Sequence, residues 1–330
     1  MQTASEIVTA AREPERPPES APARVNVPDR VWSGSLLLLG FAVLAVAAII
    51  VAELVHIGGP AISHTGVLAF VRNSVWDVTR DVFGALPFIY GTLVTSAVAL
   101  VLALPISVGL ALFLTEMAPP SVRSIVSFPI SLLAGIPSVV YGLWGLFVLV
   151  PLLRRPVEPL LAKTLGFLPL FQGPPIGLGY LAAGIVLAIM ILPTITSIAI
   201  EVLQTVPGTL REAALALGAT RWEAIRVSVL PYARAGIVGA TMLGLGRALG
   251  ETMAVTMVIG NSPSIRASLF APGYSLPAVI ANEFAEASGD LHTAALAALG
   301  LLLFAVTVAL NVAARLLVRI SRRGPTRVAA

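Results

Sequence analysis

Six long runs of apolar residues dominate the chain, and polar stretches separate them. Each run has about 20 residues or more, the length that a helix needs to cross the hydrocarbon core of a bilayer. Prolines lie inside several runs, which membrane helices tolerate when neighbouring groups satisfy the freed carbonyls. The pattern therefore predicts six membrane-spanning helices, at residues 35–57, 87–114, 124–153, 178–200, 234–260 and 291–318.

The segments outside these runs set the domain organisation. Residues 1–34 are rich in Pro, Glu, Arg and Ala and have no apolar periodicity. Such a segment buries too little apolar surface to offset the entropy lost on ordering, so we predict a disordered cytoplasmic tail. A signal peptide is not expected, because a long polar tail precedes a first apolar run of spanning length. A membrane domain at 35–320 and a second cytoplasmic tail at 321–330 complete the prediction.

Two of the connecting loops are long. The loop at 154–177 is rich in Pro and Gly, which is typical of irregular external structure. In the loop at 261–290, apolar residues at helical spacing predict a short amphipathic helix. These residues are Leu276, Val279, Ile280 and Phe284. A helix that caps the bundle is slightly favoured over an external gate or docking site.

The composition assigns the chain to the all-α integral membrane proteins. It is 57% hydrophobic and 12% charged, whereas soluble domains are less apolar and about twice as charged. The absence of cysteine excludes disulfides and cysteine-ligated metals. No zinc-protease or serine-hydrolase motif is present, and the three histidines lie near predicted external ends: His56, His64 and His292. We therefore predict no catalytic and no metal site.

The basic residues set the topology. Cytoplasmic loops of membrane proteins carry an excess of Lys and Arg. Placing both termini in the cytoplasm puts 14 arginines inside and six basic residues outside, with Arg247 within the membrane. Arg154 and Arg155 fall on the external side, against the rule. The overall bias predicts a multi-pass protein of the cell membrane with both termini cytoplasmic, and the small net charge of +4 reports topology and not binding to nucleic acid.

A cytoplasmic loop at about 206–231 has the pattern helix, tight turn, helix. Two capping boxes, a glycine suited to a helix C-terminus and a terminating proline mark it: Thr209 with Glu212, Thr220 with Glu223, Gly218, and Pro231. These devices indicate a rigid element and not a tether. Two interpretations remain open from the residues alone, a pair of interfacial helices packed on the bundle or an element that docks a partner.

The stretch LGRALGETMAV, residues 245–255, places two charges inside an apolar run. Arg247 and Glu251 are four residues apart, so in a continuous helix they share a face and can pair. Gly246 and Gly250 would leave room for a neighbouring backbone. An ionisable group in a membrane span is by default a candidate functional residue. The alternative is a structural ion pair that holds two helices together.

The chemistry of this pair favours an anionic substrate. The guanidinium of arginine stays charged when buried and matches phosphate or carboxylate with a fork of donors. Glutamate beside it can accept a hydrogen bond from the P–OH group of hydrogen phosphate, whereas fully ionised sulfate has no such donor. The residues alone therefore favour phosphate weakly.

Two resemblances extend this interpretation. The loop sequence EAALALG followed by VLP resembles the EAA loop of ABC importer permeases, although Ser228 stands where that pattern usually has Ile. The resemblance implies that Glu212, Ala213, Ala214 and Gly218 form a coupling helix that docks into a groove of an ATPase subunit. A six-helix permease of the type I importer kind is the fold that it implies.

The second resemblance is more specific. LGRALGETMAV and three further stretches, at 83–96, 134–151 and 210–225, are similar to PstC-type permeases of phosphate-import ABC transporters, and the similarity covers about residues 83–318. It implies that Arg247 and Glu251 lie on the phosphate path. It also implies four partners: a PstA-type permease, two PstB-type ATPase subunits and an external phosphate-binding protein.

The chain itself has no P-loop sequence for ATP. Its only lysine, Lys163, does not follow the required glycine pattern. ATP and Mg²⁺ are therefore expected to be used by partner subunits, with no cofactor in this chain. The alternatives are a permease for another oxyanion such as molybdate or sulfate, an ion-driven secondary transporter or channel, and a membrane-embedded enzyme.

Overall fold

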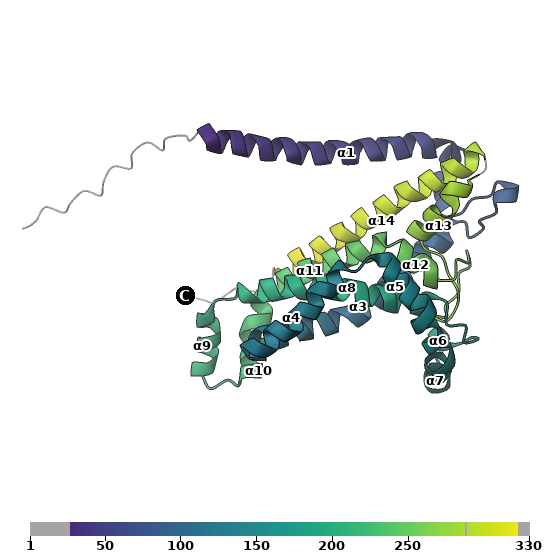
Figure 1. Cartoon of the computed structure of the whole chain (residues 1–330). Coiled ribbons are helices and arrows are strands. Elements are labelled where there is room, and N and C mark those ends of the chain that lie inside the picture. Colours follow the sequence, from purple (N-terminus) through teal and green to yellow (C-terminus); the bar gives the residue numbers. More distant parts are fainter. Residues whose placement is uncertain (1–26, 288, 323–330) are drawn as a thin grey trace, which may run out of the picture. The chain divides into compact units, whose positions relative to one another are not determined.

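The computed structural model describes residues 27–287 and 289–322, and in these residues it contains helices and loops but no β-strand (Figure 1). The chain divides into two compact units, residues 1–52 and 53–330. The main helix packing and the candidate site lie within the second unit. Six helical segments of the described residues are long and apolar enough to cross a membrane, which confirms the predicted number.

The helices follow one another with short connections, and π-helical turns interrupt several of them. In order they are α1 (Val27–Thr65), α2 (Val67–Arg72), η1 (Val78–Arg80), α3 (Leu86–Leu112), η2 (Phe113–Met117), α4 (Pro120–Gly135), α5 (Ser138–Trp144), η3 (Gly145–Leu149), α6 (Val150–Leu152), η4 (Leu153–Val157) and α7 (Glu158–Leu165). Then come η5 (Pro169–Phe171), α8 (Tyr180–Gln204), α9 (Gly208–Ala216), α10 (Arg221–Ala224), η6 (Ile225–Val229), α11 (Leu230–Gly250), α12 (Met253–Val258), α13 (Leu276–Glu283), η7 (Phe284–Glu286) and α14 (Asp290–Arg322).

Three of the predicted spans agree closely with the helices. They correspond to α3 with η2, to α8 and to α14, whose apolar segments are Leu86–Met117, Tyr180–Gln204 and Asp290–Leu316. The first span exists but is longer than predicted, because α1 begins at Val27. Residues 27–34 are therefore helical and do not belong to an irregular tail. The rest of that predicted tail, and residues 323–330 of the C-terminal one, lie outside the described residues.

The predicted span at 124–153 is wrong as a single helix. α4 ends at Gly135, and Ile136 and Pro137 have extended backbone angles before α5 begins. Proline removes a backbone donor and pushes the residue before it out of the helical region, so the chain turns there. The predicted irregular loop at 154–177 is also wrong in its first half, because η4 and α7 continue the helix to Leu165.

The centre of the second unit is α8. It is the most buried of the six spans and packs between α3 and α11. Small residues allow a close approach: a Cβ at Gly184 would lie 2.4 Å from Val98 Cγ1 of α3, and one at Gly244 of α11 would lie 2.6 Å from Ile195 Cγ1. Because packing of small residues replaces the hydrophobic effect between membrane helices, α8 is the axis against which its neighbours are fixed.

The end of the bundle near the start of α8 is closed by loops and by α13. The predicted amphipathic helix is present as α13, and Leu276 and Val279 are fully buried. Phe284 is 59% exposed and does not share that buried face, because the helix ends at Glu283. Figure 1 shows α9 and α10 at the opposite end of the unit from α6 and α7. The bundle therefore presents two different ends.

Candidate coupling loop and charged residues of the membrane path

The predicted helix–turn–helix at one end of the bundle is present, and its turn depends on Gly218. α9 ends at Ala216, and Gly218 follows with φ of +86°, a left-handed conformation that glycine adopts without strain. The Gly218 N–H donates to the Leu215 carbonyl at 3.0 Å, and the Ala219 N–H donates to the Ala214 carbonyl at 3.1 Å. This pair of bonds is a Schellman motif, which ends α9 and fixes the direction of the turn.

One of the two predicted capping boxes forms. The Thr220 hydroxyl accepts from the Glu223 N–H at 3.3 Å, and the Glu223 carboxylate accepts from the Thr220 N–H at 2.8 Å. The predicted box of Thr209 and Glu212 is wrong, because α9 begins two residues earlier than a Thr209 cap requires and has Pro207 as its N-cap. With Gly208 already helical, Thr209 is inside the first turn and cannot act as the cap.

The prediction that Pro231 ends the second helix is wrong. Residues Arg221–Gly250 form one continuous helical segment, in which η6 is a π-helical turn directly before Pro231. A π-helical turn shifts the hydrogen-bond register, so the missing N–H of proline falls where the ladder is already interrupted. The second arm of the loop is therefore the beginning of a membrane helix.

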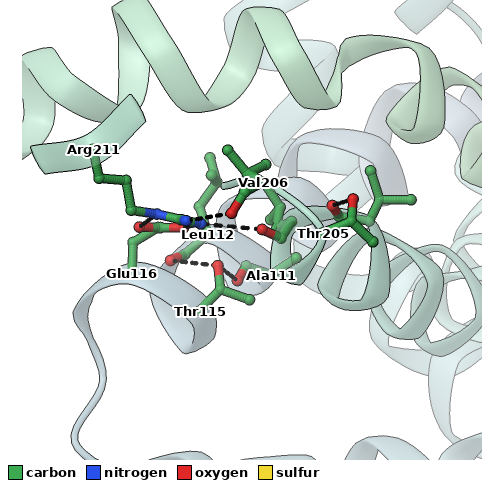
Figure 2. Close-up of polar contacts among 9 residues, drawn as sticks. Ala111, Leu112, Thr115, Glu116, Thr205, Val206 and Arg211 are labelled. Atoms are coloured by element: carbon green, nitrogen blue, oxygen red, sulfur yellow. Dashed lines mark hydrogen bonds and ion pairs between the residues drawn. The ribbon is translucent and has the colours of Figure 1, made fainter. Parts of the chain in front are cut away.

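An ion pair holds α9 to the end of α3 (Figure 2). The Arg211 guanidinium donates from Nη2 to Glu116 Oε1 at 2.7 Å and from Nε to Glu116 Oε2 at 2.9 Å. The same guanidinium donates to the carbonyls of Val206 at 2.7 Å and Leu203 at 3.1 Å, at the end of α8. Hydrogen bonding to the carboxylate raises the pKa of Arg211. One side chain thus connects α9, α3 and α8.

A small apolar core lies beneath this ion pair. It contains residues from the ends of α3 and α8, from η6 and from the start of α11: Ala111, Leu112, Ala199, Leu203, Val206, Ile225, Val229 and Ala233. The outer side of α9 is different, because Glu212, Ala213 and Gly218 are exposed and Leu217 is 90% exposed. A rigid base with an uncovered apolar tip is the arrangement of an element that inserts into a groove.

Gly218→Pro is expected to abolish the turn. Proline cannot adopt a positive φ and removes the N–H that bonds to Leu215. For the coupling helix that the resemblance to ABC importer permeases implies, we expect transport per ATP hydrolysed to fall at least about tenfold, while the membrane helices stay inserted. Gly218→Asn is the matched control, since asparagine tolerates the left-handed conformation and no atom lies within 4 Å of the added Cβ. Equal coupling in the two variants would contradict a role for the turn geometry.

Arg247 and Glu251 do not form the predicted ion pair. α11 ends at Gly250, and Glu251 has extended backbone angles, with ψ of 126°. The Glu251 carboxylate instead accepts from the Ala254 N–H at 3.2 Å, in the first turn of α12. The i,i+4 rule holds only within a continuous helix, so the break sends the two side chains apart.

Arg247 is consequently left without a countercharge. Its Nη1 makes a long contact, 3.5 Å, to the Thr194 hydroxyl of α8, and no carboxylate of the described residues pairs with it. The side chain is exposed on this chain, and nothing in the described structure lies within 4 Å of a Cβ placed at Gly246 or Gly250. An unpaired arginine in a membrane span is costly. Its charge is therefore not balanced by any carboxylate of the described residues.

Comparison with known proteins decides the family. The sequence pattern described as "Binding-protein-dependent transport system inner membrane component" matches residues 103–323. The chain is 50% identical over 291 residues to the phosphate transport system permease protein PstC of Mesorhizobium japonicum, covering 84% of this chain and 88% of that protein. This chain belongs to the PstC family. The PstC protein of Haemophilus influenzae is 49% identical over 76% of this chain and 80% of its own length.

The fold of this PstC-family chain agrees with that of solved ABC importers. The permease of a bacterial alginate ABC transporter superposes with a TM-score of 0.59 at 18% identity, covering 90% of this chain and 98% of that one. A chain of the inward-facing MetNI methionine transporter gives 0.54 at 19% identity, covering 71% and 94%. These similarities confirm the predicted six-helix permease fold of an ABC importer.

The sequence prediction for this PstC-family permease missed the pair of Arg211 and Glu116. The two residues are 95 positions apart, and neither stands in an apolar context that draws attention. A signal was nevertheless present: Glu116 lies two residues after the second predicted span, and Arg211 directly precedes the EAA-like sequence. Charges that border membrane spans on the same side are candidates for such pairs.

Proposed function

We propose that this permease carries phosphate across the cell membrane as one subunit of an ATP-driven importer. The observation that carries the proposal is the identity of about half of all residues to PstC proteins over most of both chains. A relative from Methanocaldococcus jannaschii that is named as a probable PstC protein is 39% identical over 77% of this chain. Similarity to several proteins named for phosphate transport favours phosphate over molybdate or sulfate as the substrate, and an importer over an ion-driven transporter or channel.

The exposed Arg247 gives this function a physical basis. A multivalent anion must cross a region of low dielectric constant, and a fixed cation lowers that barrier. Because Arg247 has no carboxylate partner among the described residues, its charge is available to the anion or to a second permease subunit. Glu251 contributes in a different way from the one predicted, by fixing the start of α12 beside the arginine.

The partners follow from the same proposal. The open face at Gly246 and Gly250 would meet a PstA-type permease, so that two subunits enclose the path. The exposed residues Glu212, Ala213 and Gly218 would enter a groove of one of two PstB-type ATPase subunits, which bind ATP and Mg²⁺. Phosphate would arrive from an external binding protein.

Co-purification and uptake test the proposal together. The complex assembled with its PstA-type and PstB-type subunits should take up phosphate in proteoliposomes only when ATP and the binding protein are supplied. Uptake of molybdate or sulfate in preference to phosphate would refute the substrate. Phosphate uptake by this chain alone, without an ATPase, would refute the importer and favour a channel.

The proposed orientation places the α9 loop and both termini in the cytoplasm. The basic residues near the coupling loop motivate it: Arg211, Arg221, Arg226 and Arg234. Topology reporters fused after residues 120 and 220 should report cytoplasm, and those after 75, 165 and 275 the external side. An external signal at 220 would remove the basis for a coupling loop.

A further inference from the structure

Two segments at the end of the bundle opposite the coupling loop expose basic side chains and no acidic one. α8 has 25 residues, or about 37 Å of helix, between this end and the coupling loop. Residues 154–179 and 259–275 form much of this end, and their four basic side chains are exposed: Arg154, Arg155, Lys163 and Arg266. We call these two segments the cationic platform. Arg154 and Arg155 are the residues that contradicted the charge rule for topology.

The platform presents no carboxylate. Its single acidic residue, Glu158, is only 1% exposed, and its Oε2 accepts from the Gly177 N–H at 3.0 Å. None of the four basic residues has an ion-pair partner among the described residues. The acidic side chains of this end lie on other segments, at Asp77, Asp81, Glu283, Glu286 and Asp290, so the excess of positive charge is local to the platform. Positive charge collected in this way attracts anions.

The platform is rigid, because its two segments are bonded to each other and to the bundle. The Leu269 N–H donates to the Leu170 carbonyl at 2.8 Å, which joins the segments directly. Two tyrosines then hold the segment that carries Arg266: Tyr90 of α3 donates to the Arg266 carbonyl at 2.9 Å, and Tyr180 of α8 donates to the Ser264 carbonyl at 3.0 Å. The Arg266 backbone is thus anchored to two central helices.

A hollow of about 60 Å³ lies between the two segments. Its polar lining is Arg266, Ser268 and Gln172. The Ser268 hydroxyl accepts from the Phe270 N–H, so its own hydrogen is free to be donated, and Gln172 uses one amide N–H for the Gly166 carbonyl and keeps a second. The hollow is partly open and is large enough for a small anion such as a tetrahedral oxyanion.

We propose that this hollow is an external binding site for a tetrahedral oxyanion of the phosphate class, held by the Arg266 guanidinium with Ser268 and Gln172 as further donors. The inference rests on the proposed function for the orientation of the chain and for the substrate. The site lies outside the membrane path of Arg247 and would receive the anion before it enters that path. The surrounding cations of the platform raise the local concentration of anions and keep the site salt-sensitive.

The absence of cysteine from this chain allows a direct test. Ile176 lines the hollow with a 38% exposed apolar side chain, so Ile176→Cys provides a thiol at the site without removing a donor. The assembled complex is purified without the binding protein and treated with a membrane-impermeant thiol reagent. Phosphate should slow the labelling of this chain, whereas chloride at equal ionic strength should not.

Matched variants give the controls. Arg266→Gln in the Ile176→Cys background should raise the half-protecting phosphate concentration about tenfold, because a charge-assisted hydrogen bond is lost. Arg72→Gln removes an exposed charge from α2 and should leave the half-protecting phosphate concentration unchanged. A thiol at Val75→Cys, 51% exposed on another loop of this end, should not be protected by phosphate.

The outcomes separate the site from the transport function. Protection in a complex that takes up no phosphate would support the site and refute the proposed function. Normal phosphate uptake with no protection at position 176, or with equal protection at position 75, would overturn the site. Protection by the binding protein but not by phosphate would also overturn it and would identify the platform as a protein-docking surface.

Discussion

Arg247→Gln is expected to reduce phosphate uptake per assembled complex by about a hundredfold or more. The reason is electrostatic: a charge at the centre of a bilayer costs about 3 kcal/mol, and a barrier higher by that amount slows transport by about two orders of magnitude. Because Arg247 pairs with no carboxylate of the described residues, neutralising it leaves no buried charge behind and should not prevent assembly. The measurement is uptake in proteoliposomes, normalised to assembled complex.

Two further changes at this site sharpen the test. Arg247→Lys should restore uptake only in part, because an ammonium group lacks the planar fork that matches an oxyanion. Arg234→Gln removes an exposed arginine near the start of the same helix and should leave uptake unchanged. If Arg247→Gln instead lowers the amount of complex and leaves uptake per complex normal, the arginine is a structural bridge to another subunit and not part of the path.

Glu251→Gln separates the observed geometry from the ion pair that the sequence predicts. The amide oxygen of glutamine can still accept from the Ala254 N–H, so the start of α12 should be retained. We therefore expect normal assembly and a smaller loss of uptake than for Arg247→Gln. A large loss of assembled complex in Glu251→Gln would contradict this expectation. It would show that Glu251 and Arg247 form an ion pair in the complex.

Arg211→Ala is expected to uncouple ATP hydrolysis from transport. The substitution removes four hydrogen bonds, two to Glu116 and one each to Val206 and Leu203, and leaves a largely buried carboxylate unpaired. A lost hydrogen bond to a charged group costs about 2 kcal/mol, which is enough to release α9 from α3. Phosphate transported per ATP hydrolysed should fall at least about tenfold, while ATPase activity continues.

A double-mutant cycle shows whether the ion pair is the cause. Glu116→Ala should have an effect similar to that of Arg211→Ala, and the double variant should be less impaired than the sum, since residues in contact are not additive. Arg226→Ala, an exposed arginine of the same loop, is the matched control and should leave coupling intact. Additive effects of the two changes, or normal coupling in both single variants, would contradict the role proposed for the pair.

The sequence alone determined the features that depend on a short stretch of chain. Apolar runs of spanning length identify membrane helices because the thickness of the bilayer fixes the length required. The turn at Gly218 and the capping box of Thr220 and Glu223 were also predictable from sequence, because every hydrogen bond in them joins residues only a few positions apart. The resemblance to PstC permeases, carried by LGRALGETMAV and the EAA-like loop, identified the family that the comparisons confirm.

The tertiary structure decided where helices break and which charges meet. Pro231 was predicted to end a helix, yet that helix continues through a π-helical turn. The apolar run at 124–153 was predicted to be one helix, yet it is broken before Pro137. Periodicity assumes a continuous helix, so it paired Arg247 with Glu251 and could not anticipate the break at Gly250. The pair of Arg211 and Glu116 joins elements 95 residues apart. Such contacts depend on how α3, α8 and α9 pack, and local sequence does not encode that packing.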